Sequence, residues 1–196
     1  MTGAAPQNRL ASLSQQATNA ARPRGRPPIH LWNPDFCGDI DMRIGTDGGW
    51  SYLGSPIGRP AMVKLFSTIL RKDPERYVLV TPVERVGIQV DDLPFVAVDM
   101  RTDGEGEAQT LTFVSNVGDE AAAGSEHPLR FDQADDGGLK PAVLMRDALW
   151  ARLSRPLLYD LVELGCEREI DGASWFGVWS GGRFFSICPA ADIERL

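Results

Sequence analysis

The sequence Gly54-Ser55-Pro56-Ile57-Gly58-Arg59-Pro60 runs directly into an apolar stretch, AMVKLFSTIL, at residues 61–70. Glycine allows a sharp turn, and proline is favoured at the first position of a helix because it has no N–H to leave unpaired. The stretch therefore predicts a loop that opens a helix, which we expect to end before Asp73-Pro74. A shorter version, Leu153-Ser154-Arg155-Pro156, opens a second amphipathic run.

The composition is ordinary for a globular protein. The 196 residues are 43% hydrophobic and 24% charged, with a net charge of −7. A negative surface argues against a protein that grips nucleic acid or anionic lipid over its whole surface. No apolar run approaches the ~18 residues of a membrane span, and the first thirty residues lack an apolar signal-peptide core. We expect a cytoplasmic protein with no membrane partner.

The sequence contains few residues that could bind a metal or form disulfides. The three cysteines include no C-x-x-C pair, and the sequence contains two histidines. An odd number of scattered cysteines indicates neither a disulfide framework nor a thiolate zinc site. We expect no metal and no cofactor.

Residues 1–28 are rich in Ala, Ser, Gln, Asn, Pro and Arg. Such a segment buries too little apolar surface to offset its ordering entropy, so we expect a disordered tail outside the core. Residues 23–27, PRGRP, have the form of a minor-groove hook for DNA, but a stiff proline-rich linker is the simpler interpretation. Nucleic acid is therefore not favoured as a partner.

Strand patterns surround the two predicted helices. Residues 39–44, DIDMRI, alternate, which places Ile40, Met42 and Ile44 on one face of a strand. On the other face Asp41 and Arg43 are expected to form a pair. Further strands are predicted at residues 77–81, 86–90, 95–100, 110–114, 142–146, 149–153, 166–170, 173–180 and 183–187.

The order of elements repeats, since strands and a hairpin precede each Arg-Pro helix and a meander follows it. Similarity at one offset indicates duplication. We predict two tandem similar α+β units, each a largely antiparallel sheet with one helix. The Asp135-Asp136-Gly137-Gly138 stretch is expected to join them, giving domains at residues 29–138 and 139–196.

No catalytic motif is present: there is no G-x-S-x-G, no G-x-x-x-x-G-K-[ST] and no G-x-G-x-x-G. His127 stands in a loop before proline and is read as a local cap. We name no catalytic residue.

Anion binding is the chemistry that remains. A helix start offers unpaired N–H groups and a partial positive charge, and arginine adds a fork that fits phosphate. We expect a small anionic, nucleotide-like ligand between the two units. The rival interpretation is that both arginines are structural. Our candidate ligand-binding residues are Arg59, Arg155, Gly58, Ser55, Arg43, His127, Arg130, Lys140, Trp32, Tyr52 and Tyr159.

Several uncommon strings occur in one order: WNP at residues 32–34, CGDIDMRI at 37–44, GSPIGR at 54–59, YVLVTPVE at 77–84, EHPLRF at 126–131 and GLKP at 138–141. With them the chain resembles, from about Pro28 to its C-terminus, a bacterial family catalogued as a domain of unknown function. The resemblance implies a duplicated two-domain fold with a pleckstrin-homology-like C-terminal half. It also implies a nucleotide-like ligand between the domains and a role in signalling.

Two classes of function stay open. The first is a non-catalytic ligand-binding or signalling module, with a protein partner possible. The second is an enzyme acting on a phosphorylated small molecule in the same cleft. An enzyme should show a polar cluster with a displaced pKa, whereas a sensor should show an arginine-rich pocket with aromatic walls.

Overall fold

The computed structural model describes residues 6–21, 25–134 and 138–195. The chain forms two compact units, Met1–Asp92 and Leu93–Leu196. Each contains a mostly antiparallel sheet and helix, as the α+β prediction states. Residues 135–137 of the expected joint, which spans residues 135–138, lie outside the described residues.

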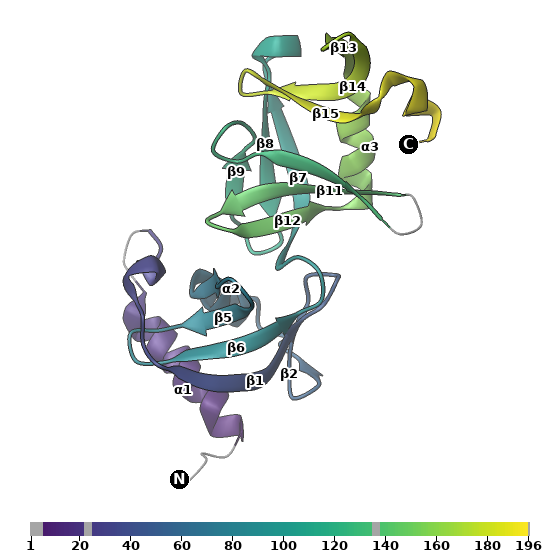
Figure 1. Ribbon diagram of the computed structural model, residues 1–196. Helices are drawn as coiled ribbons and strands as arrows, with labels where there is room; N and C mark the ends of the chain where they lie inside the picture. The colour runs from purple at the N-terminus through teal and green to yellow at the C-terminus, as the bar shows by residue number, and fades with distance from the viewer. Residues whose placement is uncertain (1–5, 22–24, 135–137, 196) are drawn as a thin grey trace. The chain divides into compact units, whose positions relative to one another are not determined.

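The first unit is one six-stranded sheet with two helices (Figure 1). Its strands lie in the order β3-β2-β1-β6-β5-β4, where β1 and β6 are parallel and every other pair is antiparallel. Its elements are α1 (Pro6–Ala20), the 3-10 turn η1 (Ile29–Leu31), β1 (Phe36–Ile44), β2 (Trp50–Tyr52), β3 (Ser55–Pro56), α2 (Pro60–Thr68), β4 (Leu70–Lys72), β5 (Tyr77–Val80) and β6 (Arg85–Val90).

The alternation predicted for residues 39–44 is present in β1, where Met42 and Ile44 are buried and Arg43 is exposed. Arg43 does not pair with Asp41 as expected. Its Nε donates to both carboxylate oxygens of Asp91, at 2.7 and 2.9 Å. The hydrogen bond and the attraction of Asp91 raise the pKa of Arg43. Asp91 lies within reach of Arg43 because it directly follows β6, whose last residue, Val90, is paired with Ile44.

Helix α2 begins at Pro60 as predicted but ends at Thr68, well before Asp73-Pro74. The hydroxyls of Ser67 and Thr68 donate to the carbonyls of Lys64 and Leu65, bonds that compete with helix propagation. The next three residues form β4, which pairs with β5. Sequence periodicity missed this short strand because three residues are too few to show a pattern.

The expectation of a disordered tail over residues 1–28 is wrong for the described part of it. Helix α1 spans Pro6–Ala20 and contacts α2, with Leu13 and Ala17 fully buried. The side-chain amide of Gln16 accepts from Thr81 and donates to Glu84, at 2.7 and 2.8 Å. Two buried apolar side chains and this polar pair hold a helix whose composition alone gives little drive to fold.

The second unit contains a six-stranded sheet and a separate three-stranded sheet, β13-β14-β15. In the larger sheet β7 and β12 are parallel and the order is β10-β11-β12-β7-β8-β9. Helix α3 contacts β7 and β14, and so lies against both sheets. The elements are β7 (Phe95–Asp103), η2 (Gly106–Ala108), β8 (Thr110–Ser115), β9 (Glu120–Ala122), β10 (Leu129–Gln133), β11 (Leu139–Arg146), β12 (Leu149–Leu153), α3 (Arg155–Glu163), β13 (Cys166–Ile170), β14 (Ala173–Ser180), β15 (Arg183–Pro189) and η3 (Ala190–Arg195).

The repeat in the sequence corresponds to a repeat in topology. In each six-stranded sheet two three-stranded meanders are joined through a parallel pair of their first and last strands, β1 with β6 and β7 with β12. The order meander, helix, meander also occurs twice, around α2 and around α3. Around α2 the two meanders share one sheet, whereas the meander after α3 forms its own.

The boundary between the units lies at residues 92 and 93, not at 138 and 139 as expected. Strand β10 pairs with β11 from Leu129↔Val143 to Gln133↔Leu139, so one sheet continues across the expected joint. An Asp- and Gly-rich sequence marks a chain reversal, and this one connects two strands of a hairpin. Among the described residues, no helix has the length and apolarity needed to cross a membrane.

Candidate functional site

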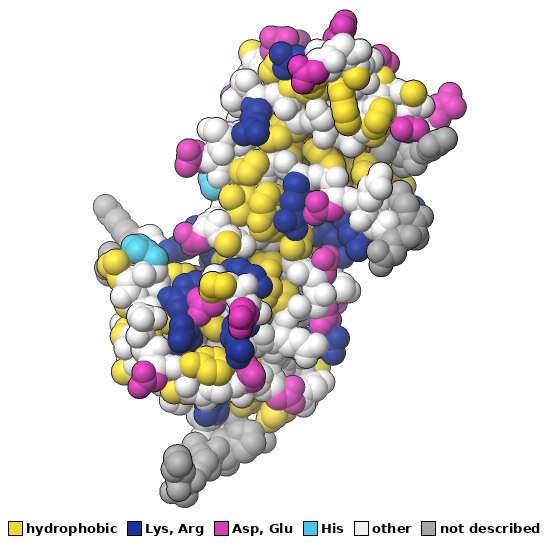
Figure 2. All heavy atoms as spheres, in the orientation of Figure 1, with side chains coloured by type: hydrophobic (Ala, Val, Ile, Leu, Met, Phe, Trp, Pro, Cys, Tyr) yellow, Lys and Arg dark blue, Asp and Glu magenta, His cyan; other side chains and the backbone are white. Residues whose placement is uncertain are grey.

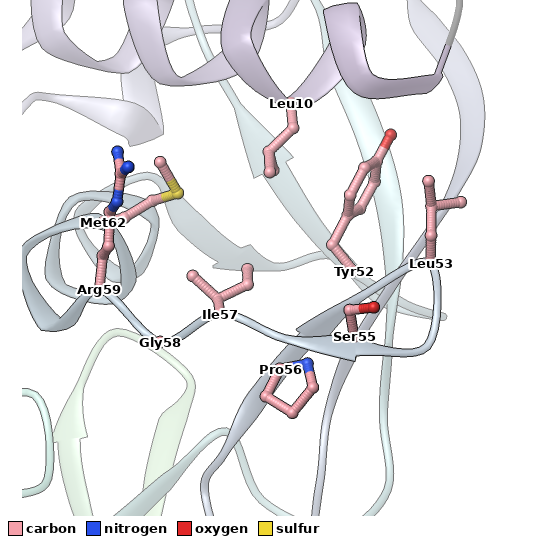
Figure 3. Close-up of a pocket in the computed structure, with 9 residues that line it drawn as sticks. All are labelled: Leu10, Tyr52, Leu53, Ser55, Pro56, Ile57, Gly58, Arg59 and Met62. Atoms are coloured by element: carbon pink, nitrogen blue, oxygen red, sulfur yellow. The ribbon is translucent and has the colours of Figure 1, made fainter.

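A pocket of about 510 Å³ lies in the first unit, beside the start of α2. Figure 3 shows Leu10 pointing from α1 toward Tyr52, Ile57 and Met62 on the facing wall. The wall is mainly apolar, and Arg59 stands beside Met62 at one end of it. The pocket therefore joins an apolar body to a single cationic group. Its lining is Leu10, Tyr52, Leu53, Ser55, Pro56, Ile57, Gly58, Arg59 and Met62.

The predicted stretch at residues 54–60 builds one side of this pocket. Tyr52 pairs with Ser55, so Leu53 and Gly54 form a two-residue hairpin turn between β2 and β3. Both have positive φ, 50° and 73°, which is the requirement of a type I′ turn. Asn, Asp and Gly are the residues favoured there, whereas Leu53 is apolar, 45% exposed and on the rim of the pocket.

Arg59 caps α2 in an extended conformation, with φ −105° and ψ 104°. Its carbonyl accepts the N–H groups of Met62 and Val63. Its side chain is exposed and makes no hydrogen bond or ion pair with any described residue. Within the same described part of the chain, the N–H groups of Gly58 and Arg59 have no acceptor. One cation and two N–H donors are thus available at the end of the pocket.

Tyr52 is 8% exposed and is the other titratable group of the pocket wall. Burial raises its pKa, the charge of Arg9 lowers it and that of Asp41 raises it, with a net rise. The phenol therefore stays protonated at neutral pH. Among the described residues that line the pocket there is no carboxylate, histidine, lysine or cysteine.

Four predicted site residues, Tyr52, Ser55, Gly58 and Arg59, come together in this pocket. In the same unit Arg43, on β1, is bound to Asp91, which directly follows β6. Trp32 follows η1, and its carbonyl accepts from Arg71 at 2.7 Å. Trp50 is buried against Phe66 in the core.

The remaining candidates belong to the second unit. Arg155, at the start of α3, donates its Nε–H to the hydroxyl of Tyr159 at 3.2 Å. His127 Nδ1 lies 2.9 Å from the carbonyl of Leu144; since a carbonyl only accepts, Nδ1 carries the proton. Arg130 lies over Trp150 and 3.0 Å from Asp132, and Lys140 is exposed on β11. That these residues contact a ligand stays a prediction.

Five pocket residues were not among the sequence candidates: Leu10, Leu53, Pro56, Ile57 and Met62. Leu10 and Leu13 are three apart, a helical spacing in an otherwise polar tail. Leu53-Gly54 follows the aromatic strand β2. The signal for Leu53 was an apolar residue at a turn position where Asn or Asp is usual. Met62 belongs to the apolar stretch that predicts the helix, and nothing in that stretch separates it from core residues.

The described residues hold no group of three or more His, Cys, Asp and Glu side chains that could bind a metal ion. Figure 2 shows Lys and Arg side chains lying among acidic and hydrophobic ones on the visible face of the first unit. This face therefore carries mixed charge.

The chain matches two domain models that cover most of its length. Residues 27–93 match "Domain of unknown function (DUF1285), N-terminal domain", and residues 94–187 match "Protein of unknown function (DUF1285), C-terminal domain". The chain belongs to the DUF1285 family. The boundary between the two matches falls within one residue of the boundary between the compact units.

Two crystal structures of DUF1285 family proteins are similar to this chain. The one from Silicibacter pomeroyi DSS-3 is 50% identical, with a TM-score of 0.84, and the match covers 93% of this chain and 98% of that one. The one from Shewanella baltica OS155 is 28% identical, with a TM-score of 0.51, and the match covers 63% of this chain and 91% of that one. No curated protein matches the chain. Helix α1 lies outside both domain matches.

Proposed function

We propose that this DUF1285 protein is a non-catalytic ligand-binding or signal-transduction module. Its ligand is a small molecule that joins an anionic group to an apolar or aromatic body. The anionic group meets Arg59 and the N–H groups of Gly58 and Arg59, and the body lies between Leu10, Ile57 and Met62. A nucleotide has this division and is the first class to test.

The observation that carries the proposal is the Arg59 guanidinium, which has no partner in the described part of the chain and lies beside an apolar pocket. Several arginines of the first unit are bound to carboxylates: Arg43 to Asp91, and Arg71 and Arg85 to Asp73. A guanidinium with open donors next to backbone N–H groups and the positive end of a helix suits a carboxylate or phosphate.

The turn at Leu53 is a second support. A non-glycine residue in the left-handed region costs roughly 1–2 kcal/mol, and leucine gains nothing there from local hydrogen bonds. A strained position at the rim of a pocket is a reason to infer function. An apolar side chain that adds to the wall for a ligand body would offset this cost.

The pocket favours binding over catalysis. General acid–base and nucleophilic catalysis need a group that exchanges a proton near neutral pH. Ser55 has no base beside it among the described lining residues, and the raised pKa keeps Tyr52 protonated. The enzyme alternative would require groups other than those of this pocket.

A thermal-shift screen tests the proposal, because a ligand that binds only the folded state raises the melting temperature. The screen would compare nucleoside phosphates, aliphatic carboxylates and inorganic phosphate on the full chain. For a compound that shifts the melting temperature, we expect Arg59→Ala to lower affinity by about tenfold or more, the loss of a hydrogen bond to a charged group. Calorimetric titration measures this affinity.

Arg101→Ala is the matched control, since Arg101 is an exposed arginine already paired with Glu120. It should leave the affinity unchanged. Unfolding without ligand should be the same for Arg59→Ala and the wild type. Equal affinity in Arg59→Ala and the wild type would reject the proposed site. A separate Arg155→Ala variant tests the prediction that the second unit contacts the same ligand.

A further inference from the structure

The three-stranded sheet of the second unit carries an aromatic pair on its outer face. Trp179 and Phe184 are directly opposite each other in β14 and β15, so their side chains share a face. Their rings meet edge to face, 5.4 Å apart at 63°. The next residues, Val178 and Phe185, are buried on the opposite face, which leaves the pair half-exposed.

Arg168 of β13 lies over this pair. Its guanidinium carbon is 4.6 Å from the centre of the Trp179 ring and 5.6 Å from that of Phe184. Gly177 makes the arrangement possible, because a Cβ there would lie 2.7 Å from the Phe184 ring. The Phe184 ring covers Gly177, and the rings of Trp179 and Phe184 form the surface on which the guanidinium stacks.

Arg168 and Arg183 differ from the other stacked arginines that the structure describes, because neither is paired with a carboxylate. Arg76, Arg130 and Arg146 also lie over rings, and each has an acidic partner within 3.4 Å. Among the described residues, the side chains of Arg168 and Arg183 make no hydrogen bond or ion pair. Stacking holds Arg168 in place and leaves its in-plane donors open.

Both arginines line one hollow of about 560 Å³, together with Trp179, Phe184, Glu169 and Asp171. The two carboxylates would repel a phosphate dianion. A ligand with one carboxylate and a neighbouring cation fits the hollow better. Its carboxylate can meet an arginine, and its cation can meet Glu169 or Asp171. A protein segment with acidic and basic side chains has this composition.

The edge of β13 is open to such a segment. β13 is the end strand of its sheet, and no described strand pairs with its outer side. Its residues Cys166 to Glu169 are exposed. An extended segment can add to a free edge, where main-chain hydrogen bonds give affinity and side chains give specificity.

Charge disfavours a second copy of the chain at this edge in the registers centred on β13. Antiparallel pairing of two β13 strands centred on Arg168 would set Arg168 against itself and Glu167 against Glu169. A shift of two residues either way sets Glu167 or Glu169 against itself. Like charges directly opposite each other are destabilising, so the edge favours a different partner.

We propose that this sheet is a docking site for an extended segment of another protein. The segment adds to β13 and carries an acidic side chain that meets Arg168 on the Trp179–Phe184 platform. Basic residues on either side of it face Glu167 and Glu169. This interaction is independent of the pocket in the first unit.

The test is a titration of the ¹⁵N-labelled full chain with the peptide acetyl-Val-Lys-Glu-Lys-Val-amide. We expect shifts of the β13 amides, the Arg168 Nε–H and the Trp179 indole N–H. Replacing the peptide's glutamate by glutamine, or Arg168→Gln in the protein, should each lower affinity by about tenfold, as expected for a charge-assisted hydrogen bond. Arg101→Gln, at an exposed arginine in the same unit, is the control and should change nothing.

A charge exchange separates recognition from folding. Arg168→Glu should lose the first peptide and bind acetyl-Val-Lys-Lys-Lys-Val-amide instead, with an unchanged near-ultraviolet circular dichroism spectrum. Failure of the exchange in a folded variant would overturn the proposal. Equal affinity of the glutamate and glutamine peptides would do the same. Shifts of the Arg168 signal with inorganic phosphate but with neither peptide would point instead to a free anion.

Discussion

The two helices that begin with Arg-Pro share a sequence signature and differ in their surroundings. Arg59 is exposed beside a pocket, with α1 on the far wall and no partner among the described residues. Arg155 donates to Tyr159 one turn along its own helix, and Tyr159 is 51% exposed. The same two residues therefore open a helix in both units, but what the helix start can bind depends on what packs beside it.

The tight turns near these helices repeat this contrast. Leu53-Gly54 and Asp171-Gly172 are both two-residue turns with positive φ, 50° and 73° against 51° and 79°. Asp171 is a residue that such a turn favours, and Leu53 is not. The two turns thus share one backbone conformation. At Asp171 the residue is one that this conformation favours, whereas at Leu53, on the pocket rim, it is not.

The largest expected effect concerns α1, which packs on α2 next to the pocket. Leu13→Ala removes a fully buried side chain and should lower the free energy of unfolding by about 2–3 kcal/mol, the low end for a leucine-to-alanine change in a core. The low end applies because a terminal helix can detach before the rest unfolds. Urea denaturation of the full chain measures the loss.

Leu10→Ala is the control for this prediction, because Leu10 is half-buried and lies at the pocket wall. It should cost less stability than Leu13→Ala and should lower ligand affinity. An unfolding free energy of Leu13→Ala equal to that of the wild type would mean that α1 contributes nothing to the first unit.

The sequence predicted elements whose pattern is local. The alternation in β1 and the Arg-Pro starts of α2 and α3 depend on neighbours a few residues away, and these predictions are confirmed. The boundary between the units was wrong because it depends on which strands pair. Strand β7 lies beside β12, more than fifty residues later, and nothing local indicates that pairing.

The candidate pocket shows the same division between residues that local patterns predict and residues that only tertiary contacts place. Ser55, Gly58 and Arg59 follow from the chemistry of a helix start. Leu10 does not, because it reaches the pocket through a helix whose sequence is mainly polar. Its place is fixed by the burial of Leu13 and Ala17 and by the bonds of Gln16 to Thr81 and Glu84, which are tertiary contacts.

An exchange between the two turns gives the next largest effect. Leu53→Asn should raise the free energy of unfolding by about 1 kcal/mol, because asparagine adopts the left-handed conformation with less strain. Asp171→Leu should lower it by a similar amount. Thermal unfolding of both variants measures the changes.

Binding distinguishes the two turns further. If Leu53 belongs to the ligand wall, Leu53→Asn gains stability and loses affinity for any compound found in the thermal-shift screen. Asp171→Leu should lose stability and keep the affinity. A Leu53→Asn variant that is both more stable and equally tight would remove the functional argument from the turn.

The smallest effect concerns Tyr52, the buried tyrosine of the pocket wall. Burial raises the pKa of Tyr52 in the folded state, so the folded chain keeps this proton at a pH where an unfolded tyrosine, with a pKa of about 10, loses it. The unfolded state then binds fewer protons, and stability falls as the pH rises from about 10 through the higher folded pKa. Tyr52→Phe has no proton to lose and should show a shallower fall in melting temperature above about pH 10, with little change below about pH 9. Equal slopes for the variant and the wild type would show that the Tyr52 phenol ionises as freely in the folded pocket as in the unfolded chain.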